Sequence, residues 1–273
     1  MKPARFDYER PADLRSVIRL IERDDIVVKI VAGSQSLGPM LNLRLVQPDL
    51  LVDITGIAEL KRVELSDDAI VIGACVTHAD IEDGRVPDVT GGALSKVARG
   101  IAYRAVRNRG TLGGSLVHAD PSADWISSLA AAGAEILIAG PSGQRRVAID
   151  DFMTGVFEVD LGPGEMLEAV RIPRFSARAR WGYHKLCRKT GEFAHAIGVV
   201  LHDPERAVCR VVLGATESKP IVMNDARALF PDGHRLDVGA ARELLTGAGH
   251  ADALDNQIHL AALKRAVDRA EQP

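Results

Sequence analysis

The sequence has little cysteine, few aromatic residues and no large excess of either charge. Its three cysteines, Cys75, Cys187 and Cys209, lie far apart, and no C-x-x-C motif occurs. This argues against a disulfide framework and against a zinc or iron–sulfur site within the chain. A net charge of -3 gives no basic field for a nucleic-acid backbone, so we expect no nucleic-acid partner. Arginines concentrate at 99–109 and 171–180. Such clusters are usually solvated surfaces, although they can also form a local anion site.

Long apolar runs are also missing. The start, MKPARFDYERP, lacks the apolar centre of a signal peptide, and the sequence contains no run of about 18 apolar residues. We therefore expect no membrane span and a cytoplasmic, reducing location. The 273 residues, 47% of them hydrophobic, are enough for two domains, because domains typically have roughly 100–200 residues.

The hydrophobic patterns predict an α+β protein. Three successive runs at 181–188, 194–203 and 207–215, separated by short turns, predict an antiparallel meander. Ahead of them we place a domain boundary near Ala177. Earlier strands are expected at 26–31, 50–55, 61–65, 69–74, 135–140 and 145–149. Helices are expected at 11–21, 92–99, 122–133, 226–230, 238–249 and 256–271.

The first candidate binding loop is AGSQSLG at 32–38, directly after an expected strand. Gly33 lacks a Cβ, and the serine hydroxyls and successive amides beside it suit phosphate oxygens. A tight strand-to-helix turn with capping serines explains the same residues. The loop has neither G-x-G-x-x-G nor a P-loop lysine, so a nicotinamide-binding Rossmann fold and a nucleoside triphosphatase are poorly supported.

The second candidate loop opens the stretch GTLGGSLVHADPSAD, where Gly110, Gly113 and Gly114 surround Thr111. Glycines at these positions are also compatible with a simple turn or a β-bulge. Two glycine loops together, however, can offer amides to both sides of a diphosphate without intervening side chains. The pair of loops therefore indicates a diphosphate-containing ligand.

Acidic and histidine side chains follow the second loop. Asp124 can accept hydrogen bonds from a ribose, or can act only as a favourable acid at the start of a helix capped by Ser122. A metal site made of Asp124, Asp120 and His118 is disfavoured, because the intervening proline and loop give no shared ligand face. The absence of a G-x-S-x-G elbow argues against a serine hydrolase. His195 lies amid apolar residues and is expected to be a core histidine.

Four segments occur in an order and spacing that resemble the FAD-binding medium subunits of molybdenum hydroxylases, the carbon monoxide dehydrogenase and xanthine dehydrogenase family. They are AGSQSL with a following N-L-R-L, RNRGTLGGSLVHADPSAD, GEMLEAVRIP and HKLCRKTGEFA. The resemblance covers essentially the whole chain. It implies a two-part FAD-binding domain of the vanillyl-alcohol-oxidase (PCMH) type over 1–176. A smaller domain with a three-stranded antiparallel sheet and helices is implied over 177–273.

The resemblance also implies the cofactor contacts. The diphosphate of FAD would lie against the first loop, Thr111 and Gly114, with Ile101 beside the flavin ring and Phe193 near its other side. The family commonly has a glycine where this sequence has Ser34. If the loop needs a positive φ at this position, the serine would be strained, because it has a Cβ and glycine does not. The implied cofactor-binding residues are Lys29, Val31, Ala32, Gly33, Ser34, Gln35, Ser36, Leu37, Ile101, Thr111, Gly114, Asp124, Leu167 and Lys185.

The function implied by the resemblance is that of an oxidoreductase subunit. Its partners would be a large molybdenum-cofactor subunit and a small subunit with two [2Fe-2S] clusters, in a dimer of heterotrimers. Electrons would pass from the clusters through FAD to an external acceptor, and the flavin would supply the chemistry in place of an acid–base dyad. Two alternatives remain: a stand-alone FAD-dependent oxidase, and a non-redox assembly subunit that has lost the cofactor.

Overall fold

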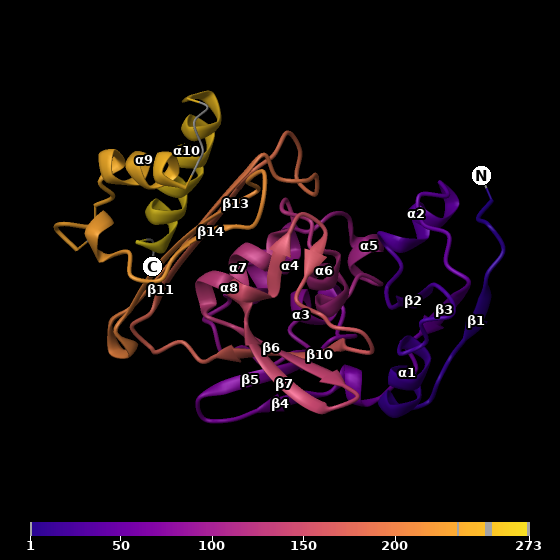
Figure 1. Cartoon of the computed structure of the whole chain (residues 1–273). Coiled ribbons are helices and arrows are strands. Elements are labelled where there is room, and N and C mark those ends of the chain that lie inside the picture. Colours follow the sequence, from indigo (N-terminus) through magenta and orange to yellow (C-terminus); the bar gives the residue numbers. More distant parts are fainter. Residues whose placement is uncertain (1, 234, 249–252, 272–273) are drawn as a thin grey trace.

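The computed structural model describes residues 2–233, 235–248 and 253–271. Helices and mainly antiparallel sheets are combined in this part of the chain, which confirms the α+β class. Figure 1 shows a small N-terminal layer, a central block of helices above a sheet, and a C-terminal sheet with its own helices. The predicted boundary near Ala177 falls in the connection between the central sheet and the C-terminal sheet.

The N-terminal layer is a three-stranded parallel sheet with two helices. Strand β3 lies between β1 and β2 and runs parallel to both. The first helix begins after Asp13, whose carboxylate accepts the Ser16 N–H at 2.8 Å. The elements are β1 (Asp7–Glu9), α1 (Leu14–Ile21), β2 (Val28–Val31), α2 (Leu37–Asn42) and β3 (Leu50–Asp53).

The central block is built on a five-stranded antiparallel sheet in the order β4-β5-β10-β6-β7. Its strands are β4 (Val63–Leu65), β5 (Ala69–Gly73), β6 (Glu135–Gly140), β7 (Gly143–Ala148) and β10 (Met166–Pro173). A 3-10 turn, η1 (Glu59–Lys61), precedes β4, and a hairpin of β8 (Met153–Gly155) and β9 (Glu158–Val159) precedes β10. The helices are α3 (His78–Glu82), α4 (Ala93–Gly100), α5 (Arg104–Arg107), α6 (Leu112–His118), α7 (Asp124–Ala132) and α8 (Ile149–Phe152).

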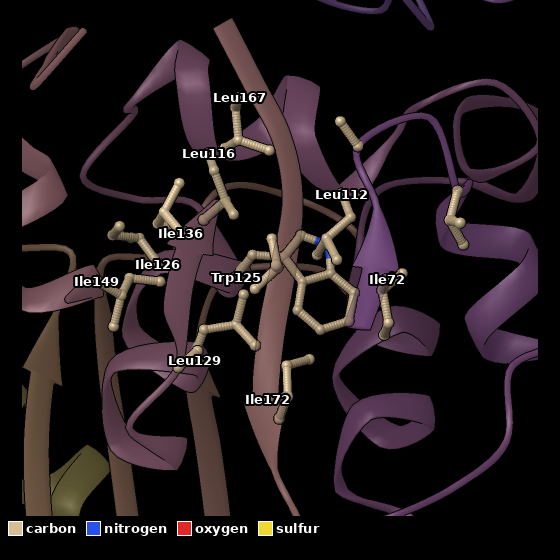
Figure 2. Packing of buried hydrophobic residues seen from close by; sticks show 14 of the residues in the cluster. Ile72, Leu112, Leu116, Trp125, Ile126, Leu129, Ile136, Ile149, Leu167 and Ile172 are labelled. Atoms are coloured by element: carbon tan, nitrogen blue, oxygen red, sulfur yellow. The ribbon is translucent and has the colours of Figure 1, made fainter. Parts of the chain in front are cut away.

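Helix α7 forms the centre of the core, because every one of its residues is buried. Trp125 stands among the apolar side chains of Leu112, Leu129 and Ile172, between helices and the central sheet (Figure 2). The prediction that Ser122 caps helix α7 was wrong. Ala123 occupies the N-cap position and makes no side-chain hydrogen bond there. Ser122 instead donates its N–H to Asp120 in the preceding turn.

The C-terminal sheet has four antiparallel strands in the order β11-β12-β13-β14. The predicted meander is present as β11 (Arg180–Leu186), β12 (Ala196–Asp203) and β13 (Val208–Gly214). The family resemblance implied three strands in this sheet, and the structure has a fourth. The additional β14 (Ile221–Met223) has three residues and follows a proline, so no strand pattern marked it in the sequence.

Helices cover both faces of this sheet. Helix α10 (Ala253–Ala270) contacts β11 and β12 from one side, and α7 contacts β12 and β13 from the other (Figure 1). The remaining elements are η2 (Pro204–Arg206), η3 (Arg227–Leu229) and α9 (Val238–Gly247). The helix expected at 226–230 is thus only a 3-10 turn, and Gly249, at the end of the helix expected over 238–249, lies outside the described residues.

Two further expectations concern single features. His195 was expected in the core, but it is exposed, and its backbone N–H bonds to Leu186 O at the entrance to β12. Apolar neighbours therefore did not imply burial, because the strand they belong to begins only at Ala196. Within the described ranges, no helix is long and apolar enough to cross a membrane. The cytoplasmic location stays a prediction.

Candidate cofactor site

The two glycine loops meet in the structure. A Cβ at Gly33 would lie 2.1 Å from the carbonyl oxygen of Arg109 and 2.8 Å from the Cα of Gly110. Gly33 is also buried, and its own carbonyl accepts a hydrogen bond from Gln35 Nε2 at 2.9 Å. Only a residue without a side chain permits this backbone contact between loops separated by more than 70 positions.

Ser34, next to that contact, has a φ of 60°. This is the left-handed region, where a residue with a Cβ is strained and glycine is not. Its carbonyl accepts the Gly38 N–H at 3.1 Å, which closes the turn into α2. The geometry that makes serine unfavourable at this position is therefore present.

The second loop continues directly into helix α6, and its glycines lie on different sides of the backbone. Thr111 is the N-cap, and its Oγ1 accepts the Gly114 N–H at 3.1 Å. A Cβ at Gly113 would lie 2.6 Å from Ala74 Cβ, so Gly113 packs inward, whereas Gly114 is exposed. The exposed side of this helical turn is free of side chains only because of Gly114.

A buried histidine supports the loop contact from behind. A Cβ at Gly110 would lie 2.9 Å from the imidazole ring of His78. The backbone N–H of His78 donates to the carbonyl oxygen of Gly110. Trp125 Nε1 donates to His78 Nδ1 at 3.1 Å. Burial, with a smaller contribution from the charge of Arg107, lowers the pKa of His78 to about 4. His78 is therefore neutral at pH 7, which suits its role as an acceptor.

A second group of predicted residues meets at the start of α7. Asp124 is 7% exposed and forms an ion pair with Lys185 Nζ at 2.8 Å. The hydroxyl of Tyr183 donates to the same carboxylate oxygen of Asp124. Burial and the negative charge of Asp124 raise the pKa of Tyr183 well above its usual value, so this hydroxyl keeps its proton. Two donors thus compensate one buried carboxylate.

Tyr183 and His78 were not among the residues predicted from the sequence. Tyr183 could have been found from Lys185, because residues two apart on a strand share one face of the sheet. His78 left no such signal, since its partners, Gly110 and Trp125, are distant in sequence.

Lys185 also binds the end of α4. Its Nζ donates to the carbonyl oxygen of Gly100 at 2.9 Å. Ile101 follows directly as the C-terminal cap of α4 and is half-buried against the core. Phe193 lies in the loop between β11 and β12 and is 71% exposed. Leu167 is 3% exposed beside Leu116 in the core, so any contact with a ligand would come from its backbone (Figure 2).

The other predicted residues lie along β2 and the start of α2. Lys29 is exposed on β2, whereas Val31, Ala32 and Leu37 are half-buried. Ser36 is the N-cap of α2 without a side-chain hydrogen bond. Within the first loop, the backbone contact with the second loop is made at Gly33.

The residues once considered for a metal are occupied otherwise. His118 lies against the ring of Phe157 at a centroid distance of 5.1 Å, and Asp120 accepts the Ser122 N–H. Across the described part of the chain, no group of three or more His, Cys, Asp or Glu side chains is placed to hold a metal ion.

These features fit a dinucleotide better than a small anion. Two backbone turns converge where a Cβ at Gly33 would fill the contact, and Gly114 leaves an open side-chain-free surface on α6. The ion pair of Asp124 and Lys185 lies on a separate set of elements, α7 and β11. A ligand that contacts both groups must extend from the paired turns to α7 and β11.

Several proteins of known family are similar to this chain in sequence. The family model of the FAD binding domain in molybdopterin dehydrogenase matches residues 4–175. The carbon monoxide dehydrogenase medium chain of Hydrogenophaga pseudoflava is 33% identical over 82% of this chain and 78% of its own length. The caffeine dehydrogenase subunit beta of Pseudomonas sp. (strain CBB1) is 32% identical over 81% of this chain and 76% of its own length.

Solved structures show the same relationship over the whole chain. A carbon monoxide dehydrogenase from Hydrogenophaga pseudoflava superimposes with a TM-score of 0.87 at 30% identity, covering 99% of this chain and 98% of the other. Quinoline 2-oxidoreductase from Pseudomonas putida 86 gives a TM-score of 0.84 at 32% identity, covering 99% of each chain. The chain therefore belongs to the FAD-binding family of molybdopterin dehydrogenases and is a medium, flavin-carrying subunit of an oxidoreductase of the molybdenum hydroxylase type.

Proposed function

We propose that this subunit passes electrons from [2Fe-2S] clusters of a partner chain, through non-covalently held FAD, to an external acceptor. The observation that carries the proposal is the contact of the two glycine loops, with Gly33 against Arg109 and Gly110, beside an exposed Gly114. Bound FAD would supply the redox chemistry, for which protein side chains have no equivalent. The chain itself supplies binding, orientation and electrostatics.

The diphosphate is assigned to the first loop and to the start of α6. Backbone amides of residues 32–37 would approach it from one side, and the exposed turn at Thr111 and Gly114 would face it from the other. Such amides stabilise negative oxygens without a side-chain charge. The missing Cβ at Gly114 supports this assignment, because it leaves the exposed side of the first turn of α6 free of a side chain.

The remaining parts of the cofactor are assigned to the second group. Asp124 uses its Oδ1 for Lys185 and Tyr183, which leaves its Oδ2 for a ribose hydroxyl. Ile101 and Phe193 are proposed to lie on either side of the flavin ring. Lys29 and Leu167 are proposed as further contacts, Lys29 by its exposed side chain and Leu167 by its backbone.

The proposal extends to architecture and assembly. Residues 1–176 would form the PCMH-type FAD-binding domain, and 177–273 the smaller domain that supplies Lys185. The partners would be a large molybdenum-cofactor subunit and a small [2Fe-2S] subunit, in a dimer of heterotrimers. The names of related proteins, which describe medium chains and subunits of two dehydrogenases and a hydroxylase, support an assembly of this kind.

Purification of the native complex tests the electron route. The expected composition is molybdenum, iron and FAD, with one FAD for each copy of this chain. After reduction by dithionite, the intact complex should reduce an acceptor such as NAD, a quinone or oxygen. The complex stripped of FAD should keep reduced clusters yet lose that transfer.

Other results would favour the alternatives. Turnover by the isolated flavin-loaded chain with an organic substrate would identify a stand-alone oxidase. A complex that contains the partner subunits but no flavin would identify an assembly subunit without a cofactor. Either result would overturn the proposed route.

A further inference from the structure

Three successive carbonyl groups bind two cationic side chains where α4 ends. Gly100 O accepts from Lys185 Nζ at 2.9 Å, while Ile101 O and Ala102 O accept from Arg107 Nη1 at 2.9 and 3.1 Å. Ala102 has a φ of 41°, in the region that favours glycine. Residues 100–102, hereafter the strapped bend, are thus held in a strained turn by charged donors.

Arg107 is built into this bend by a bidentate pair with Glu82. Its Nε and Nη2 donate to the two oxygens of Glu82 at 2.7 and 3.0 Å, and the side chains are 11% and 12% exposed. The hydrogen bonds from Arg107 hold the pKa of Glu82 below its usual value. A planar guanidinium can bind a carboxylate along one edge and two carbonyls with another nitrogen, whereas a lysine ammonium cannot match this geometry.

The strapped bend also supports the loop that carries Phe193. A Cβ at Gly191 would lie 2.5 Å from Ala102 O, so the loop backbone rests on the carbonyl that Arg107 binds. Gly191 itself has a φ of 91°, which requires glycine. Ile101 and the loop around Phe193 therefore depend on the same short bend.

We propose that Arg107 is a positioning residue for the flavin ring, acting through the strapped bend. The inference rests on the proposed function, because that function places Ile101 and Phe193 beside the ring. Without the guanidinium, two carbonyls lose their donor and Ala102 can leave its strained conformation. The surfaces on both sides of the ring then shift together.

The chain offers a matched control in Arg104. It binds Glu82 at 2.9 Å and Asp83 on the surface, from the same helix α5, and its partners here are carboxylates. Arg107→Lys and Arg104→Lys both keep the positive charge. They differ in whether donors to the strapped bend are removed.

FAD binding and flavin spectroscopy of the complex test the inference. We expect Arg107→Lys to weaken FAD binding by about 10-fold or more and to shift the flavin absorption bands and midpoint potential. Arg104→Lys should leave all three unchanged. If Arg107→Lys fails to fold, Glu82→Gln, which keeps the bend carbonyls bonded but weakens the anchor of Arg107, should shift the same readouts in the same direction by less.

The outcomes separate the two levels of the account. Unchanged FAD affinity, spectrum and potential in Arg107→Lys, even with reduced thermal stability, would show a purely structural arginine and overturn the inference. An unchanged spectrum in a folded Glu82→Gln would do the same where Arg107→Lys cannot be obtained. A wild-type complex that binds no FAD would instead overturn the proposed function.

Discussion

Lys185 and Asp124 form a buried ion pair between β11 of the C-terminal sheet and the first residue of α7. The Nζ and Oδ1 atoms are 2.8 Å apart, and the side chains are 8% and 9% exposed. The two residues come from the two domains that sequence analysis predicts. A cofactor bound near this pair would therefore depend on both of these predicted domains.

Lys185→Met should be strongly destabilising. It leaves the Asp124 carboxylate buried with the Tyr183 hydroxyl still donating to it, and breaking one side of a buried pair costs roughly 3–5 kcal/mol. Urea unfolding of Lys185→Met, of Asp124→Asn and of the double variant Asp124→Asn/Lys185→Met measures the coupling energy between the two side chains. Additive effects in this cycle would show that the pair contributes nothing as a pair.

Gly114→Val and Gly33→Ala should affect different properties. A Cβ at Gly114 would lie 2.8 Å from Thr111 Oγ1, the N-cap acceptor of α6, and otherwise faces an exposed surface. The free energy of unfolding should therefore fall by no more than the value of that cap, roughly 0.5–2 kcal/mol. FAD affinity should fall, on the order of 10-fold or more, because the new side chain occupies the side-chain-free surface proposed for the diphosphate. Gly33→Ala should destabilise the fold itself, because its Cβ overlaps the backbone of Arg109.

Calorimetric melting and flavin fluorescence titration distinguish the two variants. A Gly114→Val protein with wild-type FAD affinity would mean that Gly114 serves only the helical turn. A Gly33→Ala protein with unchanged melting temperature would mean that the two loops separate without cost.

Ser34→Gly should stabilise the protein. The φ of 60° at Ser34 costs a residue with a Cβ roughly 1–2 kcal/mol, which exceeds the entropic cost of glycine, about 0.5–1 kcal/mol. Chemical denaturation should therefore show a gain of up to about 1 kcal/mol, with FAD affinity unchanged or higher. A loss of stability would show that the Ser34 side chain makes a compensating contribution.

His78 should make stability depend on pH in the acidic range. The pKa of the folded state is about 4 because of burial, whereas the unfolded state takes up a proton near 6.5. As pH falls from about 6.5 to 4, the unfolded state binds more protons, and stability decreases by on the order of 3 kcal/mol. His78→Asn, which keeps an acceptor for Trp125, should flatten this decrease.

His184 titrates in the same window, since burial lowers its pKa to about 4 as well. Urea midpoints at several pH values for wild type, His78→Asn and His184→Asn separate the two contributions. Equal slopes in wild type and His78→Asn would contradict the neutral, buried state of His78.

Much of this fold could be predicted because its signals are local. The apolar runs of the meander strands and the glycine loops each lie within short stretches of sequence, and the order of the family motifs indicates FAD. What could not be predicted depends on contacts between distant segments. Ser122 does not cap α7, because its N–H bonds to Asp120 in the preceding turn. His195 is exposed, because strand β12 begins only at the next residue.

The arginine-rich segment 99–109 shows the same limit. The sequence pattern predicts solvated charges or an anion site, but Arg107 is buried and binds Glu82 together with two carbonyls. Arg104 binds carboxylates on the surface. Glu82 lies 25 positions away from Arg107, and no sequence period joins such residues.

The central claim is that this chain holds FAD for electron transfer. The most direct measurement is the flavin content of the chain in its native complex, released by acid and identified by mass. We predict one FAD for each copy of the chain, released without proteolysis. A complex with its molybdenum and [2Fe-2S] subunits in place, but with no flavin after mild isolation, would contradict the account.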